Sequence, residues 1–108
     1  MTNKFTEANF DEEVMKSDVP VLVDFYADWC GPCQMMGPVV EQLSIDYAAK
    51  VKVGKVNVDE APNLASRFNV RSIPSFIFFK EGDVVDRVVG GVPIHELSDR
   101  LDNLLLRL

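Results

Sequence analysis

Apolar residues follow two different periods along this chain, and these periods predict an alternation of strands and helices. Residues 21–27 are apolar except for one aspartate, which is typical of a strand that is covered on both faces of a sheet. Residues 51–58, in which valine recurs, predict another strand. Between these runs, apolar side chains return at helical spacing at Met36, Val40, Leu43 and Tyr47. This segment is therefore expected to be a helix that connects the two strands.

The rest of the chain predicts smaller elements. Apolar positions 10, 14 and 15 mark a short first helix, with Thr6 or Asn9 as its cap. Residues 62–68 suggest a second short helix, because their proline falls in the first turn, where no N–H is needed.

Three further elements are expected. The apolar runs at 75–80 and 84–89 are separated by Glu81-Gly82-Asp83 and predict a hairpin. Leucines at helical spacing over 97–105 indicate a closing amphipathic helix. A first strand is expected around residues 4–5.

This order of elements indicates the α/β class, with helices on both faces of one mixed sheet. The length of 108 residues favours one domain that spans residues 1–108 and buries a core of its own. The sequence shows no repeat, low-complexity segment or interdomain linker.

Composition argues against several classes of function. The chain carries 11 basic and 17 acidic residues, a net charge of −6, and has no basic run. This balance argues against binding to nucleic acid or to an anionic membrane. No apolar stretch approaches the roughly 18 residues that cross a membrane. The amino terminus also lacks the apolar segment of a secretory signal, so we expect a cytoplasmic protein, although a trimmed precursor would look the same.

The two cysteines of the chain, Cys30 and Cys33, are its strongest chemical signal. They lie where the apolar run ends and the helical pattern begins. Thiols at positions i and i+3 of a helical turn face the same way, and their separation suits a disulfide, which needs a Cα–Cα distance of roughly 4.4–6.8 Å. A ring this small adds little stability, because loop-closure entropy grows with loop length. A disulfide here is therefore better explained as a redox switch than as a structural cross-link.

Other interpretations of the cysteine pair are weaker. The closed loop is too short for a structural disulfide to help, and a zinc site needs more ligands than one Cys-x-x-Cys motif supplies. The single histidine, His95, lies far along the chain, near the start of the last helix, where a surface or capping position explains it. We therefore expect no bound metal or cofactor, only the redox-active disulfide Cys30–Cys33.

Asp24 is a second anomaly, because it is the one carboxylate in an apolar strand. Aspartate is rarely buried unless it is paired, and burial would raise its pKa. The alternative is an Asp24 that is exposed at a sheet edge. Lys55 likewise interrupts the strand at 51–58, and a surface lysine whose stem lies along apolar residues would explain it.

Several separated motifs, in the right order, make the sequence resemble the thioredoxin family over essentially its full length. They are Val-Asp-Phe-Tyr-Ala-Asp before Trp-Cys-Gly-Pro-Cys at 29–33, Pro38, Lys-Val-Asn-Val-Asp at 55–59, Ile73-Pro74 and Gly90. The resemblance implies the thioredoxin fold, a central mixed sheet of five strands flanked by four helices. It also implies a protein-disulfide reductase that reduces client proteins with electrons from a thioredoxin-reductase-type donor. We expect it to work as a monomer.

The chemistry of exchange predicts different roles for the two sulfurs, since it needs an accessible thiolate close to a resolving thiol. Cys30 lies just before a helix, where free backbone N–H groups and the helix dipole should lower its pKa and make it the attacking sulfur. Cys33, one turn into the helix and expected to be more buried, would resolve the mixed disulfide. Around them, Pro32 suits the first turn, Gly31 leaves space for a peptide, and Trp29 supplies an apolar shoulder.

The resemblance also implies a proton carrier. Asp24 would lie behind the cysteine pair and exchange protons with Cys33 through water. Lys55 would approach Asp24.

A docking surface is implied as well. Pro74 would be cis, although only about 5–6% of X–Pro bonds in folded proteins are. It would leave the preceding backbone free to pair with an extended substrate. Ile73 and Gly90 would complete an apolar surface with Trp29. A core side chain and a strand-end turn are the alternatives for Ile73 and Gly90.

The sequence departs from the family pattern at Gln34, where a basic residue is usual, and at Tyr26, which replaces a frequent tryptophan. The sequence is less compatible with two other functions. The Gly-Pro pair between the cysteines disfavours an oxidant or isomerase. The intact cysteine pair disfavours a binding subunit without redox turnover as the sole role, although binding could be a second role.

Overall fold

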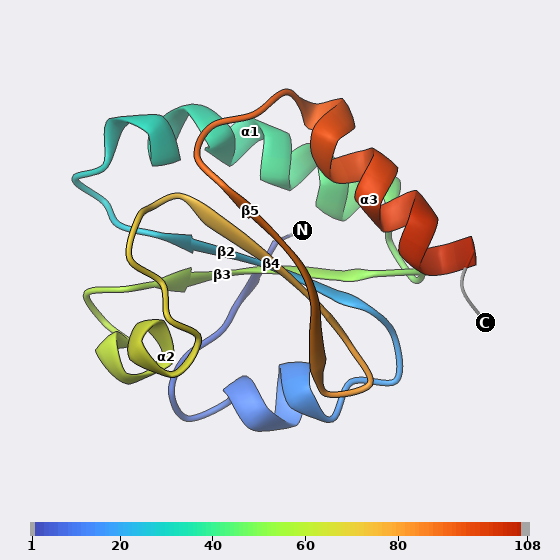
Figure 1. The fold of residues 1–108 in the computed structure, drawn as a ribbon, viewed down its shortest axis with the longest axis horizontal. Coiled ribbons are helices and arrows are strands. Elements are labelled where there is room, and N and C mark those ends of the chain that lie inside the picture. The colour runs from blue at the N-terminus through green and yellow to red at the C-terminus, as the bar shows by residue number, and fades with distance from the viewer. Residues whose placement is uncertain (1, 107–108) are drawn as a thin grey trace.

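The computed structural model describes residues 2–106, which form a five-stranded mixed sheet with helices on both faces (Figure 1). The strands are β1 (Asn3–Lys4), β2 (Val21–Tyr26), β3 (Lys52–Asn57), β4 (Ser75–Lys80) and β5 (Asp83–Val89). The helical elements are the π-helix η1 (Asp11–Met15) and the α-helices α1 (Gly31–Asp46), α2 (Pro62–Arg67) and α3 (Ile94–Leu106). The expected fold class is confirmed.

The strands lie side by side in the order β1-β3-β2-β4-β5. β1, β3 and β2 run parallel, whereas β4 is antiparallel to both β2 and β5. β2 is therefore the central strand and is hydrogen-bonded on both sides. Because β2 and β3 are parallel, their carboxyl ends reach the same edge of the sheet, and the loops that follow them meet there.

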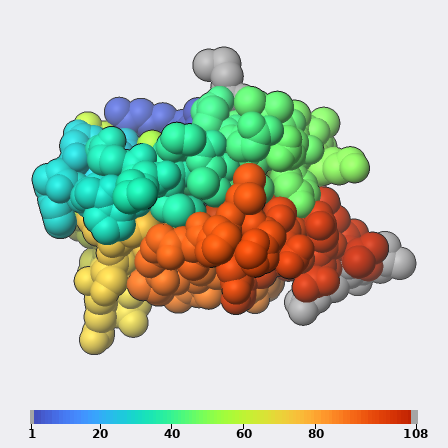
Figure 2. All heavy atoms as spheres, turned by 90° about the horizontal axis from the view of Figure 1, so that it is seen from above, coloured from blue at the N-terminus to red at the C-terminus, as the bar shows by residue number. Residues whose placement is uncertain are grey.

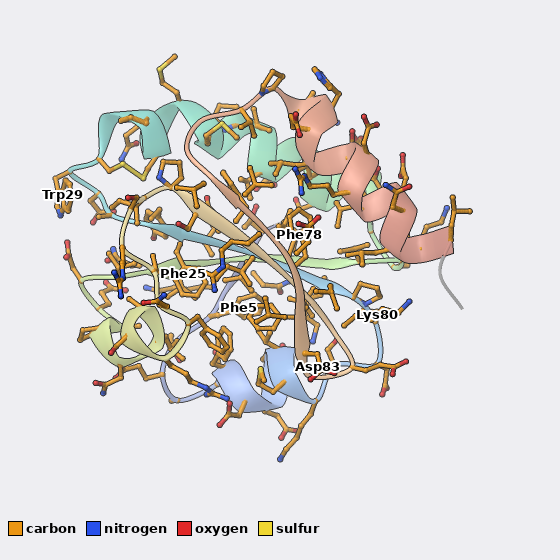
Figure 3. The ribbon with its side chains drawn as sticks, viewed as in Figure 1. Phe5, Phe25, Trp29, Phe78, Lys80 and Asp83 are labelled. Carbon is orange, nitrogen blue, oxygen red and sulfur yellow. A yellow bond between two sulfur atoms is a disulfide. The ribbon has the colours of Figure 1, made fainter. Side chains whose placement is uncertain are left out.

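The helices divide into two layers. α1 and α3 cover one face of the sheet, while η1 and α2 cover the other (Figure 1). Figure 2 looks onto the first layer and shows α1 and the carboxyl-terminal segment lying side by side. Each layer closes over its own cluster of buried apolar side chains. Phe78 lies on the α3 side, and Phe5 and Phe25 lie on the side of η1 and α2 (Figure 3).

Side chains alternate between the two faces along β2. Leu22 belongs to the cluster under α1 and α3, whereas Val23 and Phe25 belong to the opposite cluster. Asp24, which follows the same alternation, therefore shares its face with Leu22 and lies under α1. The strand places this carboxylate and the start of α1 in one layer.

The amino-terminal strand is short, and its main contact with the core comes from the residue after it. Phe5 is buried, and its backbone N–H donates to the Lys55 carbonyl at 2.9 Å. The Phe5 ring lies against Gly54, where any side chain would collide with it. Glycine in β3 thus makes room for the aromatic residue that attaches β1 to the core.

The turn before η1 is closed by two reciprocal bonds rather than by one cap. The Thr6 N–H donates to Asn9 Oδ1 at 2.7 Å, and the Asn9 N–H donates to Thr6 Oγ1 at 3.2 Å. Both residues expected at this position therefore contribute, one turn ahead of the helix.

The hairpin loop is one residue shorter than expected. Asp83 pairs with Lys80 and belongs to β5, so only Glu81 and Gly82 connect the strands. Both have positive φ angles, 53° and 79°, as a two-residue hairpin turn requires. The sequence did not show that Asp83 belongs to the strand, because an aspartate is compatible with either the turn or the strand end.

α3 packs against the sheet through leucines on its inner side, while Leu106 at its end is exposed. Leu97, Leu101 and Leu104 are buried, while Asp99 and Asp102 on the other side are exposed. No helix within residues 2–106 has both the length and the apolar character needed to cross a membrane.

Candidate active site

The cysteine motif occupies the connection between the central strand and α1. Cys30 is the N-cap of α1, with extended backbone angles of −87° and 111°. Its N–H donates to the Ala27 carbonyl at 3.2 Å, and its carbonyl accepts from the Gln34 N–H at 3.1 Å. Gly31 and Pro32 follow in the first turn, where proline needs no partner for a missing N–H. Nothing lies within 4 Å of a side chain added at Gly31, so the space expected there is present.

Cys30 and Cys33 form a disulfide, with their Cα atoms 5.2 Å apart (Figure 3). Each is 5% exposed, so the expectation that Cys33 is the more buried of the two is wrong. The turn brings both into one cluster with Ala27, and Tyr26, Val58 and Ile73 pack around it. What does distinguish the sulfurs is hydrogen bonding, because the Cys33 N–H donates to Cys30 Sγ at 3.3 Å. Negative charge on Cys30 would be stabilised by this bond and by the helix N-terminus.

The loop before β4 lies against the disulfide. The Ile73–Pro74 peptide bond is cis, as the resemblance implied, and Pro74 is buried. The Ile73 carbonyl oxygen is 3.8 Å from Cys30 Sγ. The Gly90 N–H donates to the Pro74 carbonyl at 2.8 Å, with Gly90 at a φ of 96°, which favours glycine. Ile73, Pro74 and Gly90 therefore come together beside Cys30.

Trp29 is the first residue of the Trp-Cys-Gly-Pro-Cys motif, and its side chain projects outward and is 72% exposed (Figure 3). Its indole Nε1–H donates to Asp59 Oδ2 at 2.8 Å. Asp59 is in turn positioned by the buried Asn57, whose Oδ1 accepts the Asp59 N–H at 2.9 Å. The sequence interpretation did not assign a role to Asp59. A carboxylate just after β3, at the same sheet edge as the end of β2, was the available signal.

Replacement of Asp59 by alanine is expected to free the indole without disturbing the fold, because both side chains are at the surface. Trp29 is the single tryptophan of the chain, so its fluorescence reports on this contact directly. We expect a lower fluorescence anisotropy in Asp59→Ala. Glu60→Ala is the matched control, since Glu60 pairs with Lys4 instead. Equal anisotropy in the two variants and the unmodified protein would contradict a positioning role for Asp59.

Two surface hollows flank the disulfide. One, of about 320 Å³, is lined by Trp29, Val58, Pro62, Ala65, Val70, Arg71 and Ile73. The other, of about 460 Å³, is lined by Pro32, Met35, Met36, Val39, Gly91, Val92 and Pro93. Both are largely apolar, and Met35, at 80% exposed, offers an adaptable apolar side chain at the rim of the second. Met36 is buried in the core.

Asp24 is 1% exposed, and neither of its carboxylate oxygens has a hydrogen-bond partner within residues 2–106. Burial raises the pKa of Asp24 from its usual 3.8 to about 7, while the charge of Lys55 opposes the rise. The edge-exposed alternative is therefore excluded. Asp24 lies two residues before Tyr26, on the same face of β2 as the tyrosine that packs against the cysteine cluster. A carboxyl group with this pKa can gain or lose a proton at neutral pH.

Lys55 lies opposite Asp24 in the register of β2 and β3, on the same face of the sheet. Its ammonium nitrogen lies 4.3 Å from the centre of the Tyr26 ring rather than at hydrogen-bond distance from the carboxylate. A cation over an aromatic face is attracted by the ring electrons. Tyr26 thus holds the positive charge near Asp24 without neutralising it.

Neither Gln34 nor His95 contributes a charge or a metal ligand to the site. Gln34 Nε2 donates to the Asp28 carbonyl at 2.9 Å and so fastens the loop before Cys30. His95 is exposed on α3. Within residues 2–106, no group of three or more histidine, cysteine, aspartate or glutamate side chains could hold a metal ion.

Comparison with known proteins agrees with this geometry. A family model described as Thioredoxin matches residues 1–103. The chain is 52% identical over 100 residues to "Thioredoxin 1" of Synechococcus elongatus, covering 93% of this chain and 94% of that protein. It is 53% identical over 100 residues to "Thioredoxin 1" of Nostoc sp., with the same coverage, and 46% identical over 99 residues to "Thioredoxin M-type, chloroplastic" of Pisum sativum, covering 92% and 58%.

These matches extend over nearly the whole chain and include the strand, the turn and the helix that carry the Cys30–Cys33 disulfide. The protein acts as a thiol–disulfide oxidoreductase that reduces protein disulfides by dithiol exchange, and the chain belongs to the thioredoxin family.

Proposed function

We propose that the protein is a general cytoplasmic reductant in which Cys30 attacks client disulfides and Cys33 completes the exchange. The observation that carries this assignment is the place of Cys30 Sγ, which receives the Cys33 N–H at the start of α1 and faces the Ile73 carbonyl at 3.8 Å. A thiolate at a helix N-terminus is stabilised and nucleophilic. Cys33, inside the helix, is within bonding distance of that sulfur.

The reaction transfers two electrons to the client. The Cys30 thiolate forms a bond to one client sulfur, the client S–S bond breaks, and the other client sulfur leaves as a thiolate that takes up a proton. Cys33 then loses its proton and attacks Cys30 Sγ. The mixed disulfide breaks, the second client thiol is released, and the protein is left oxidised as the Cys30–Cys33 disulfide. A reductase of the thioredoxin-reductase type must return the two electrons before the next cycle.

Asp24 is proposed as the acceptor of the Cys33 proton. A buried carboxyl group with a pKa of about 7 is half ionised at neutral pH, so it can accept a proton and release it again. Lys55, held over Tyr26, limits the rise of this pKa through its charge. A water molecule would carry the proton between Asp24 and Cys33.

The client is proposed to dock on the surface formed by Trp29, Gly31, Pro32, Ile73, Pro74 and Gly90. These residues come from the β2–α1 connection, the loop before β4 and the end of β5. Exposed apolar side chains beside Cys30, with a bare backbone at Gly31 and next to Pro74, suit an extended polypeptide of varied sequence.

A reducing compartment follows from this role, since the dithiol must be regenerated continually to act as a reductant. We therefore place the protein in the cytoplasm. It is proposed to act as a monomer on disulfide-containing client proteins, without a bound cofactor.

The reduction potential of the Cys30–Cys33 pair tests the direction of electron flow. Equilibration with glutathione buffers of graded ratio should give a potential near or below the cytosolic glutathione poise, roughly −220 to −260 mV. A potential some 100 mV higher would identify an oxidant and contradict the proposed direction.

A further inference from the structure

A third hollow near the site is lined mainly by polar residues, two of which are arginines. It has a volume of about 310 Å³ and is lined by Asn69, Arg71, Ser72, Ser75, Arg87 and Val89. Arg71 belongs to the segment that leads into Ile73–Pro74, and Arg87 belongs to β5, at the edge of the sheet. Both side chains are exposed. The fold thus brings together two guanidinium groups that are 16 positions apart in the sequence.

These two cations differ from most others in the protein. Several basic residues form ion pairs with carboxylates, among them Lys4, Lys16, Lys52, Arg67 and Arg100. Arg71 instead donates Nε–H to the amide oxygen of Asn69 at 3.0 Å, and Arg87 donates from Nη2 to the Phe68 carbonyl at 2.7 Å. Within residues 2–106, neither guanidinium has an acidic partner. In a chain of net charge −6, the hollow is therefore a local excess of positive charge.

The hollow lies within reach of a client that is bound at Cys30. Arg71 and Ile73 both line the neighbouring apolar hollow together with Trp29, so the two hollows share Arg71 as a wall. The Ile73 carbonyl is 3.8 Å from Cys30 Sγ. An extended chain advances about 3.3–3.6 Å per residue. A client side chain two to four residues from the reacting cysteine can therefore extend to the arginines.

We propose that Arg71 and Arg87 form a carboxylate-binding subsite that favours client segments with an aspartate or glutamate close to the reactive disulfide. The inference rests on the proposed reduction of client disulfides at Cys30. A guanidinium carries five N–H donors in a planar fork that matches a carboxylate. The structure engages one nitrogen of each group with a neutral acceptor, which leaves donors for a client. Since the protein is acidic overall, attraction of an acidic client requires a local site of this kind.

Matched peptides test the subsite. Each peptide carries one intramolecular disulfide and, two, three or four residues outside it on either side, either glutamate or glutamine. We expect the reduced protein to reduce at least one glutamate peptide about fivefold faster, in kcat/KM, than its glutamine partner at low salt, as for a favourable surface ion pair. The ratio should fall towards one in 0.5 M salt, because screening weakens exposed charges.

Three variants separate the subsite from other effects. In the double variant Arg71→Gln/Arg87→Gln the glutamate-to-glutamine ratio should fall to about one. Arg71→Gln alone should lower it as well, and this variant leaves intact the bond from Arg87 to the Phe68 carbonyl at the end of α2. Lys50→Gln removes the same charge at the far end of α1, where Lys50 has no acidic partner within residues 2–106, and should keep the full ratio.

Reduction of hydroxyethyl disulfide, which is small and uncharged, separates failure of the subsite from failure of the proposed function. If the unmodified protein reduces this compound but reduces both peptides of every pair equally fast, the subsite is wrong and the proposed function stands. A ratio that survives in the double variant, or that is lost equally in Lys50→Gln, also overturns the subsite. Failure to reduce hydroxyethyl disulfide and every one of the peptides overturns the proposed function and the subsite with it.

Discussion

Cys33→Ser is expected to convert the protein into a trap that stays joined to its clients. Cys30 remains at the helix N-terminus and still attacks, because the Cys33 N–H that donates to Cys30 Sγ is a backbone group and survives the substitution. A serine hydroxyl cannot attack the resulting mixed disulfide at a useful rate. Incubation with a disulfide-bonded client should therefore give a covalent adduct on a non-reducing gel, and turnover should fall to the uncatalysed background.

Cys30→Ser is the matched comparison. It removes the sulfur that faces the Ile73 carbonyl, and the remaining thiol belongs to a residue inside the helix. We expect few adducts from this variant and an equally complete loss of turnover. Alkylation of the reduced unmodified protein should strike Cys30 before Cys33. Preferential trapping by Cys33 in the Cys30→Ser variant would reverse the assignment of the two roles. The experiment is needed because Cys30 and Cys33 are equally exposed, so exposure does not show which of them attacks.

Asp24→Asn is expected to stabilise the protein at neutral pH and to slow its turnover. The unfolded chain ionises Asp24 near its usual 3.8, whereas burial raises the pKa to about 7 in the folded state. Ionisation of Asp24 is therefore harder in the folded protein than in the unfolded chain. At 1.36 kcal/mol per pKa unit, this difference destabilises the fold by about 4 kcal/mol once the pH exceeds 7.

The sign of the pH dependence follows from the raised pKa. Below pH 3.8, both the folded and the unfolded state hold the proton, so the ionisation of Asp24 costs nothing. The cost grows as the pH rises and becomes complete above about 7. The variant should therefore match the unmodified protein near pH 3 and exceed it at pH 8 by about 2–4 kcal/mol, since the asparagine amide still lacks partners. The corresponding rise in Tm at pH 8 is about 10–20 °C.

Thermal melting from pH 3 to 8 measures this difference, and stopped-flow kinetics of client reduction measures the loss of the proton acceptor. We expect the step in which Cys33 attacks to slow about tenfold to a hundredfold. Asp18→Asn is the control, because it removes the same charge from an exposed side chain and should change neither quantity. An Asp24→Asn variant with unchanged stability and unchanged turnover would show that Asp24 carries no proton in the cycle.

The two effects together would also separate function from stability. A buried carboxyl group that has no hydrogen-bond partner within residues 2–106 costs free energy at the pH where the protein works. Its persistence in β2 is explained if the same group moves a proton during each cycle. Replacement of a residue with a purely structural role would not raise the stability of the protein while lowering its turnover.

Much of the fold is already determined by local sequence patterns. Strand β2 was predicted to within one residue, and the existence of helices α1 and α3 was predicted from their apolar positions, because each depends on a period in apolar residues that extends over several turns or pleats. The redox pair Cys30 and Cys33 was also predictable from the local sequence. Cys30, Gly31, Pro32 and Cys33 are consecutive, so the turn that joins the sulfurs needs only the local helical geometry.

Other features depend on how distant segments meet. Asp59 reaches the Trp29 indole from 30 positions away because β2 and β3 are parallel and end at one edge of the sheet. Lys55 approaches Asp24 closely enough for its charge to oppose the rise in the Asp24 pKa, as expected, but its ammonium lies over the Tyr26 ring, a placement that only the packed face reveals. Neither contact follows from periodicity, because a shift of one residue in strand register would turn each side chain to the opposite face.

By itself, then, the sequence determined which residues form the elements and which sulfurs can react, since both follow from short-range geometry. The tertiary structure alone decided the environment of those residues. It buried Asp24 with no hydrogen-bond partner within residues 2–106, buried Cys30 and Cys33 to the same extent, and assembled Arg71 and Arg87 in one hollow. The physical reason is that burial and electrostatic effects depend on the atoms around a group in space, which strand order and register set only when the whole chain has folded.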